Sequence, residues 1–167
     1  MRGIVQLPVA LARRAVLVWA FLLLPAVAIA AGDDAQTPQY ATGELTIVSA
    51  SGSHRFHVEL AETPAQMERG LMFREDLAPD AGMLFDFKQP TMATMWMKNT
   101  LIPLDMLFVD QAGRIVNIQE RAVPLSTAII AAAAPVCAVI ELSGGTAARL
   151  GIKPGDRVIF PIFGPAS

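Results

Sequence analysis

The stretch ELTIVSASGSHRFHVEL, residues 44–60, contains two short segments in which apolar and polar residues alternate. In the second segment Phe56, Val58 and Leu60 fall on one face of an extended chain, because successive side chains of a strand point to opposite sides. The residues Ser51, Gly52 and Ser53, which favour turns, separate the two segments. This pattern predicts a β-hairpin and indicates a fold built mainly from antiparallel strands.

Short apolar runs bounded by turn residues continue along the chain. Thr63, Pro64 and Gln66 form an N-terminal capping pattern for a short helix that ends at Gly70, and a second short helix is expected at 144–151. Residues 122–135 are ambiguous between a loop and a loop with one helical turn. Further strands are predicted at 82–87, at about 95–100, and at 104–109, 114–120, 136–142 and 157–160.

About eight strands and two short helices predict a β-rich α+β fold, a compact and mostly antiparallel small barrel or sandwich. We expect one globular domain at 44–167, preceded by a flexible leader at 31–43.

The first thirty residues have the features of a secretory signal peptide. Arg2, Arg13 and Arg14 give a basic start, an uncharged apolar run follows, and Ala28-Ile29-Ala30 matches the small-x-small pattern of a cleavage site. The apolar run has about 16 residues, shorter than the roughly 20 that a membrane span needs. We therefore expect cleavage after Ala30, a periplasmic or extracellular location, and no stable membrane insertion afterwards.

Charge and cysteine content narrow the partners of the mature chain. Three of the thirteen basic residues and none of the fifteen acidic ones lie in 1–30, so the mature chain has a net charge near −5. Such a charge disfavours binding to nucleic acid. The single cysteine, Cys137, cannot form an internal disulfide and lies in an apolar run, which indicates a buried small side chain. No cofactor is predicted.

The segment MWMKNTLIPLD, residues 95–105, places charges within an apolar stretch, and buried charges are usually paired. In an extended segment Trp96 and Lys98 share a face. If residues 100–103 form a loop, antiparallel pairing places Lys98 opposite Asp105. One interpretation is an ion pair that sets strand register. The other is the floor of a pocket, with Trp96 as a wall and the two charges holding a polar ligand.

Two further charged residues are candidates for such a pocket. Arg74 follows the apolar stretch GLMF, and its guanidinium group is suited to a carboxylate or phosphate. Glu141 ends an apolar run and shares a strand face with Cys137 and Val139, so we expect it to be partly buried or at the rim of the sheet.

Two other functions remain open. Met92, Met95 and Met97 have the spacing M-x-x-M-x-M beside a tryptophan, and thioethers select Cu(I), so a periplasmic copper carrier is one alternative. Strand geometry counts against it, because Met92 faces away from the other two. A hydrolase-like enzyme is the second alternative, although we find no catalytic motif and favour a protein that is not an enzyme.

Several longer segments resemble the bacterial and archaeal "domain of unknown function 192" family. They are RGLMFRE, GMLFDF, WMKNTLIPLDMLFVD, VIEL and LGIKPGDRV, and the resemblance covers roughly residues 44–161. The resemblance implies a single compact β-rich domain, often exported, with no established activity and no catalytic residues to transfer. The motif positions that it implies are Gly70, Leu71, Met72, Arg74, Gly82, Met83, Trp96, Lys98, Asn99, Thr100, Pro103, Asp105, Glu141, Gly155 and Asp156.

Because many of these motif positions are polar, the resemblance favours a binding role. We therefore predict a pocket near residues 96–105 that binds a small polar or anionic molecule or a partner peptide. Its predicted ligand-binding residues are Trp96, Lys98, Asn99, Asp105, Arg74 and Glu141.

Overall fold

The computed structural model describes residues 38–164. The predicted signal peptide and most of the predicted leader lie outside these residues. Strand β1 (Ala41–Ser49) begins three residues before the predicted start of the domain. None of the helices in this part of the chain is long and apolar enough to cross a lipid bilayer.

The predicted hairpin at 44–60 is confirmed. Strands β1 and β2 (Gly52–Ala61) pair antiparallel, and Ser49 lies opposite Gly52, so the turn consists of residues 50 and 51. Leu45, Ile47, Phe56 and Val58 are all buried, as the alternation of apolar and polar residues requires.

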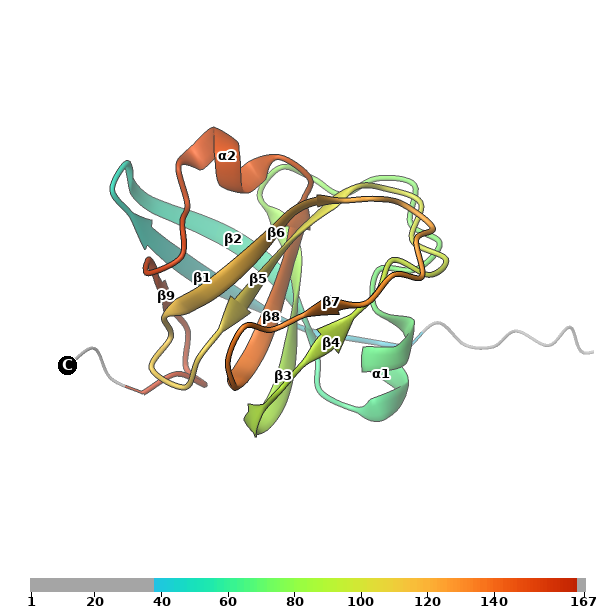
Figure 1. The fold of residues 1–167 in the computed structure, drawn as a ribbon, viewed down its shortest axis with the longest axis horizontal. Helices are drawn as coiled ribbons and strands as arrows, with labels where there is room; N and C mark the ends of the chain where they lie inside the picture. Colours follow the sequence, from blue (N-terminus) through green and yellow to red (C-terminus); the bar gives the residue numbers. More distant parts are fainter. Residues whose placement is uncertain (1–37, 165–167) are drawn as a thin grey trace, which may run out of the picture. The chain divides into compact units, whose positions relative to one another are not determined.

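The fold is strand-rich, with a curled sheet of seven strands that forms a half-barrel and a small second sheet of two strands (Figure 1). The large sheet has the order β6-β5-β8-β3-β2-β1-β9, and all its pairs are antiparallel except β2 with β3. Its other strands are β3 (Ala81–Thr91), β5 (Leu104–Val109), β6 (Ile115–Ala122), β8 (Val136–Ser143) and β9 (Arg157–Ile159).

The two edges of the sheet approach each other at one end. Val158 in β9 donates its N–H to the carbonyl of Gly113 at 2.7 Å, and Ile115 donates to the carbonyl of Asp156 at 2.9 Å. These bonds connect the end strand β9 to the turn before β6. Helix α1 and the small sheet lie at the other end of the half-barrel (Figure 1).

Both predicted helices are present. In α1 (Pro64–Arg69) the Thr63 side chain accepts from the N–H of Gln66, and the Gln66 side chain accepts from the N–H of Thr63. Helix α1 provides the connection that the parallel pair β2 and β3 requires. Helix α2 (Thr146–Leu150) ends at Gly151, which has a left-handed conformation.

The predicted strand at 95–100 is wrong. Strand β4 contains only Thr94 and Met95, and it pairs with β7 (Ile130–Ala131), which lies within the ambiguous segment 122–135. The following residues form turns, and β5 pairs with β6 and β8 instead of with residues 95–99.

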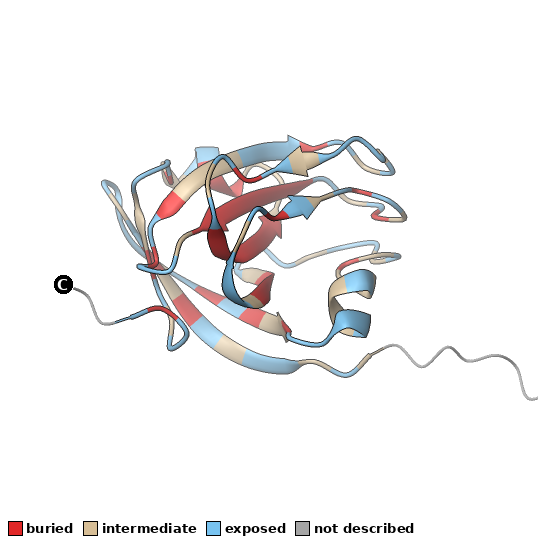
Figure 2. Ribbon diagram, turned by 60° about the horizontal axis from the view of Figure 1, so that its bottom comes forward, coloured by how far each residue is buried: buried red, intermediate tan, exposed pale blue. Residues whose placement is uncertain are grey.

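Strands β5 and β8 and residues 82–86 of β3 are buried on both faces, as the red segments of Figure 2 show. One face packs against β1, β2 and α2 and includes Leu84, Leu107 and Ile140. The opposite face includes Met83, Met106 and Val139 and is covered by the loops around the small sheet. Along β5 and β8 neighbouring residues therefore face different cores, which decides the surroundings of the acidic residues on these strands.

Candidate functional site

Asp105 is fully buried and is used by the fold itself. One carboxylate oxygen accepts from the N–H groups of Arg121 at 2.8 Å and Gly145 at 2.9 Å, and the other accepts from Ala147 at 2.7 Å. The last two N–H groups lie at the start of α2, which has no capping side chain of its own. Asp105 thus caps α2 from another strand, and its acceptor sites are occupied.

The predicted pairing of Lys98 with Asp105 is wrong. Leu142 in β8 lies opposite Asp105, while Lys98 is exposed on a turn. The Lys98 ammonium instead lies 5.6 Å from the ring centroid of Trp96, which is itself 49% exposed. Trp96 and Lys98 do share a side of the chain, but Trp96 does not shield an ion pair.

Arg74 and Asn99 also have structural contacts. The Arg74 guanidinium forms a two-point ion pair with the carboxylate of Glu59, with one contact at 2.9 Å, and this hydrogen bonding raises the pKa of Arg74. The Asn99 carbonyl accepts from the N–H of Phe73 at 2.8 Å, and the Asn99 amide group lies 3.8 Å from the sulfur of Met72. Asn99 therefore joins two loops, and Arg74 is paired with Glu59.

Glu141 and Trp96 are the two predicted ligand-binding residues that line a cavity. Glu141 lies on β8 between Met83 of β3 and Met106 of β5, on the face opposite to Asp105. Only 4% of Glu141 is exposed, and nothing among residues 38–164 forms a hydrogen bond or ion pair with its carboxyl group. Burial raises the pKa of Glu141 to about 8. The carboxyl group is therefore mostly protonated at neutral pH.

The carboxyl group of Glu141 is accessible from a narrow slot of about 30 Å³. Every fully inaccessible side-chain oxygen in the described part of the chain has a hydrogen-bond partner, so the unpaired oxygens of Glu141 keep a small accessible area, and Glu141 lines this slot. Helix α1 and the turn at 70–72 form one wall, and Met95, Trp96 and Thr100 form the other. Glu141 is thus a buried polar residue that lines this slot.

A wider groove of about 340 Å³ adjoins the slot between α1 and β4. The two share Met67, Glu68, Phe85, Met95 and Trp96, so we treat the groove and the slot as adjoining parts of one candidate site. Phe87 and Thr94 complete the lining of the groove, which is mainly apolar. Here we call the combined cavity the Glu141 groove.

The end of α1 is shaped to pack against the floor of this groove. Gly70 has a positive φ of 45°, and a Cβ atom at this position would lie 3.1 Å from the Phe85 ring. A side chain at position 70 would therefore be strained and would press on Phe85, so glycine lets the chain turn closely over the groove floor.

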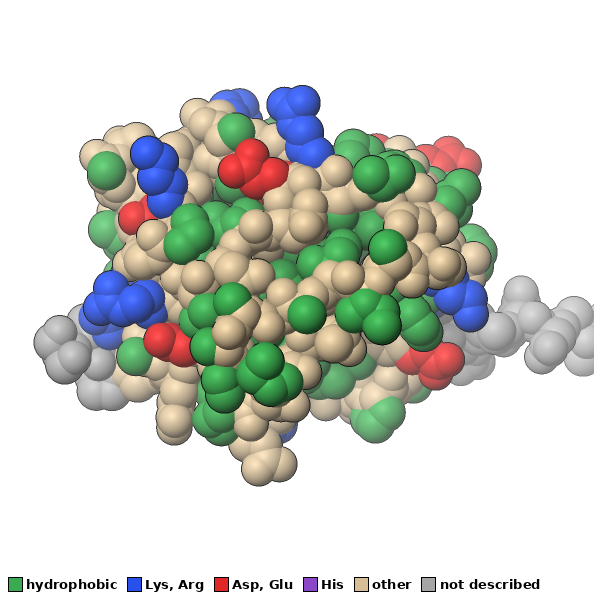
Figure 3. All heavy atoms as spheres, viewed as in Figure 1, with side chains coloured by type: hydrophobic (Ala, Val, Ile, Leu, Met, Phe, Trp, Pro, Cys, Tyr) green, Lys and Arg blue, Asp and Glu red, His purple; other side chains and the backbone are tan. Residues whose placement is uncertain are grey.

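The loops around the groove contain unusual backbone conformations. Phe73, Asn99 and Leu125 have φ values of 64°, 57° and 62°, although residues other than glycine rarely adopt positive φ. The N–H of Leu125 also donates to the carbonyl of Thr100 at 3.0 Å. Such strain concentrates at functional sites. Hydrophobic side chains are also exposed on the face with the small sheet (Figure 3), and Trp96 and Leu125 are among the exposed large residues.

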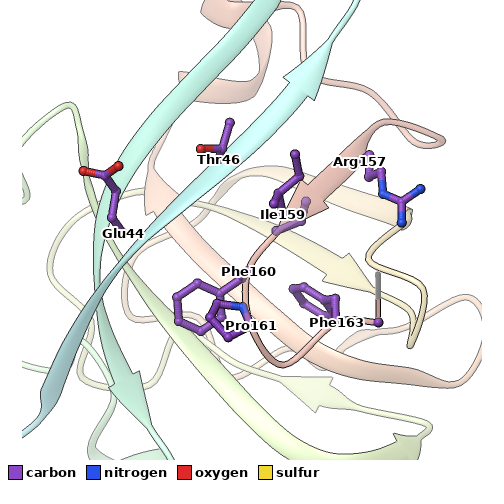
Figure 4. A pocket seen from close by; sticks show the side chains of 9 residues that line it. Glu44, Thr46, Arg157, Ile159, Phe160, Pro161 and Phe163 are labelled. Atoms are coloured by element: carbon purple, nitrogen blue, oxygen red, sulfur yellow. The ribbon is translucent and has the colours of Figure 1, made fainter. Parts of the chain in front are cut away.

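A second cavity, of about 420 Å³, lies near the C-terminus beside β1 and β9. Figure 4 shows Phe160, Pro161 and Phe163 grouped in it, with Glu44 set apart from them. The Glu44 side chain is half exposed and lies 3.6 Å from Arg55. Gly164, the last residue that the structure describes, lines this cavity, so we base the site on the Glu141 groove.

The predicted copper ligands do not converge. Met97 is fully buried in the core and Met92 is 58% exposed, so only Met95 of the three lines the slot. Met67 and Met72, which the prediction did not include, line it as well. Within residues 38–164 no three histidine, cysteine, aspartate or glutamate side chains are close enough to share a metal ion.

Comparison with known proteins agrees with the resemblance found in the sequence. The family model of DUF192, described as "Uncharacterized ACR", matches residues 46–160. The chain belongs to the DUF192 family. No curated protein matches this DUF192 chain.

Two solved structures are similar to this DUF192 chain. One, from Sinorhizobium meliloti 1021, is described as a proposed transcription regulator. It is 51% identical, covers 73% of this chain and 95% of its own, and has a TM-score of 0.71. The other, a protein of unknown function from Novosphingobium aromaticivorans, is 49% identical, covers 71% of this chain and 85% of its own, and has a TM-score of 0.70.

Sequence reasoning identified Trp96 and Glu141 but missed most of the apolar lining. Met67, Phe85 and Phe87 contribute to the groove although none was proposed for it. Phe85 and Phe87 share a strand face in the sequence, a signal that indicates only that the face is buried. Thr100 was among the implied motif positions, and it lines the slot.

Proposed function

We propose that this DUF192 chain is an exported protein that binds a small molecule in the Glu141 groove. The observation that carries the proposal is the carboxyl group of Glu141, which is buried without a partner in the lining of a cavity. Burying a polar group without a hydrogen bond is unfavourable, so a group that served stability alone would be expected to have a partner. A perturbed carboxyl group in a cleft is typical of functional sites.

The lining of the groove supports a ligand with an apolar body and a polar end group. Pockets for small molecules are usually apolar with a few polar groups that orient the ligand. An anionic end group is disfavoured at the slot once Glu141 is ionised, above about pH 8, because the two charges would repel, and Arg74 is paired with Glu59. The exposed ring of Trp96 at the groove could cover the ligand body, and a partner peptide could supply such a body as a side chain.

Filling the groove is expected to abolish binding. A library of small molecules is screened by the rise in melting temperature of the purified protein. Met67→Trp should abolish the rise in melting temperature that ligands of the groove cause, because Met67 lines both the slot and the groove. Ala65→Trp is the matched control, since Ala65 is exposed on the same helix, and it should retain this rise. Shifts that survive Met67→Trp would place the ligand elsewhere, and the proposal would be rejected.

Export is part of the proposal and rests on residues 1–30. After expression of the full chain in a Gram-negative host, we expect the periplasmic protein to begin at Ala31, because Ala28-Ile29-Ala30 has the residues of a cleavage site. N-terminal sequencing measures this directly. Ala30→Arg should block cleavage at this site. An intact residue 1 on wild-type protein from the soluble cytoplasmic fraction would contradict export.

A further inference from the structure

We infer that the ligand of the Glu141 groove is a primary amine with an apolar body, whose ammonium group enters the slot and pairs with Glu141. This inference rests on the function proposed above and names the class of ligand. Three features of the site support it: the unmatched acidic group, the size of the slot and the apolar character of the groove.

No basic side chain among residues 38–164 pairs with Glu141. Its neighbours in the sheet, Met83 and Met106, are fully buried and apolar. Arg69 lines the slot as well, but its guanidinium lies 4.5 Å from the centroid of the Phe73 ring and does not pair with Glu141, and Lys98 lies over Trp96. An ion pair inside a desolvated slot would be strong because it is a charge-assisted hydrogen bond away from water. The missing positive group must therefore come from the ligand.

The size of the slot selects a small end group. A cavity needs about 10–15 Å³ to hold one water molecule, so the slot of about 30 Å³ accepts a group of roughly one or two heavy atoms. An ammonium group on its methylene carbon meets this limit. A trimethylammonium group is too bulky, and so is a guanidinium group with its four heavy atoms. A hydroxyl group fits by size but brings no charge.

The groove outside the slot suits the rest of the molecule. Its volume of about 340 Å³ lies at the lower end of the range for small-molecule sites. Met67 and Met95 line it together with Phe85, Phe87 and Trp96. Methionine side chains adapt their shape to what they contact, so the groove should tolerate different alkyl and aryl bodies.

Binding should depend on pH in a defined direction. Burial raises the pKa of Glu141 to about 8, so below this pH an entering ammonium group must displace the carboxyl proton. The affinity should therefore rise about tenfold for each pH unit between pH 5 and pH 8, and then level off. The other charged residues that line the slot, Glu68 and Arg69, both lie on α1. The residues that face it from β3 and from 95–100 are uncharged.

Isothermal titration calorimetry of the purified protein with four hexyl compounds tests the inference. Hexylamine should bind at pH 8, hexanol at least about tenfold more weakly, and hexanoate and hexyltrimethylammonium not measurably. Glu141→Gln should weaken hexylamine binding by at least about tenfold while leaving hexanol binding nearly unchanged. Glu75→Gln, at an exposed residue outside the lining of the slot and the groove, is the matched control and should change the affinity less than about threefold. Phenylethylamine and butylamine extend the test to other bodies.

Each other outcome overturns the inference in a recognisable way. Equal affinity for hexylamine and hexanol, or tight binding by Glu141→Gln, would show that the groove binds apolar bodies without using the carboxyl group. The proposed function would then survive, as it also would if a different class of molecule gave shifts sensitive to Met67→Trp. Stoichiometric Cu(I) binding without amine binding would make the slot a thioether site and overturn the inference. If no amine binds, the inference is rejected whatever the screen finds.

Discussion

The Glu141→Gln substitution is expected to stabilise the ligand-free protein at pH 8 by about 3–4 kcal/mol more than at pH 5. The pKa of Glu141 rises from an ordinary value of 4.5 to about 8 in the folded protein because the side chain is buried. Between these values the folded state holds a proton that the unfolded state has released. The free energy of unfolding of the wild type should therefore fall by about 1.4 kcal/mol for each pH unit between about pH 5 and pH 8.

Glutamine is uncharged and nearly isosteric with protonated glutamate. The free energy of unfolding of the variant should therefore not fall with pH in this way. Urea unfolding of the wild type and of Glu141→Gln at pH 5, 6, 7 and 8 measures the difference in their free energies of unfolding. The contributions of all other titrating groups are the same in both proteins and cancel in this difference. Glu68→Gln is the control, because Glu68 is exposed and should contribute less than about 0.5 kcal/mol to the difference. Equal effects of Glu141→Gln at pH 5 and pH 8 would show that the folded protein does not shift this ionisation.

The Asp105→Ala substitution is expected to destabilise the protein by about 3–5 kcal/mol. It removes the acceptors of three N–H groups, on Arg121, Gly145 and Ala147, and two of these groups begin α2. An unsatisfied buried donor costs about 1–3 kcal/mol, and the three costs are only partly additive because water enters the site. Asp105→Asn should lose less, since its amide oxygen still accepts and only its NH2 group opposes a donor.

Urea unfolding at one pH provides the measurement for Asp105. Asp110→Ala is the matched control: the Asp110 side chain also accepts from two backbone N–H groups, those of Ala112 and Arg114, but in an exposed turn. It should cost about 1 kcal/mol or less. A loss below 1 kcal/mol for Asp105→Ala would contradict the capping role. Ligand binding should persist in Asp105→Asn, because Asp105 and Glu141 lie on opposite faces of the sheet.

Local patterns in the sequence determined much of the fold. The alternation in residues 44–60 specified which side chains of the β1–β2 hairpin are buried, and the structure confirms it. The capping residues Thr63 and Gln66 located the start of α1, and Gly151 the end of α2. These features depend on residues only a few positions apart, so a single sequence is sufficient to predict them. The β-rich, mostly antiparallel class followed from them.

Tertiary structure decided the partners of the strands and, through them, the site. The segment at 95–105 was expected to fold back on itself, but β5 instead lies between β6 and β8 in the large sheet. Pairing between distant segments depends on which arrangement buries the most apolar surface across the whole chain, and no short window of sequence contains that information. For this reason Lys98 does not lie opposite Asp105, as the sequence had predicted.

Tertiary packing also gave different surroundings to Asp105 and Glu141, two acidic residues that the sequence could not distinguish. Asp105 and Glu141 both lie on central strands, yet Asp105 faces the start of α2 and Glu141 faces the slot. Strand alternation by itself assigned each residue to a face, and it correctly grouped Glu141 with Val139. Only the packing of distant elements over each face supplied three N–H donors to one carboxylate and none to the other carboxyl group. The sequence alone thus identified both residues as candidates, and the tertiary structure decided that Asp105 caps a helix whereas Glu141 lines the slot.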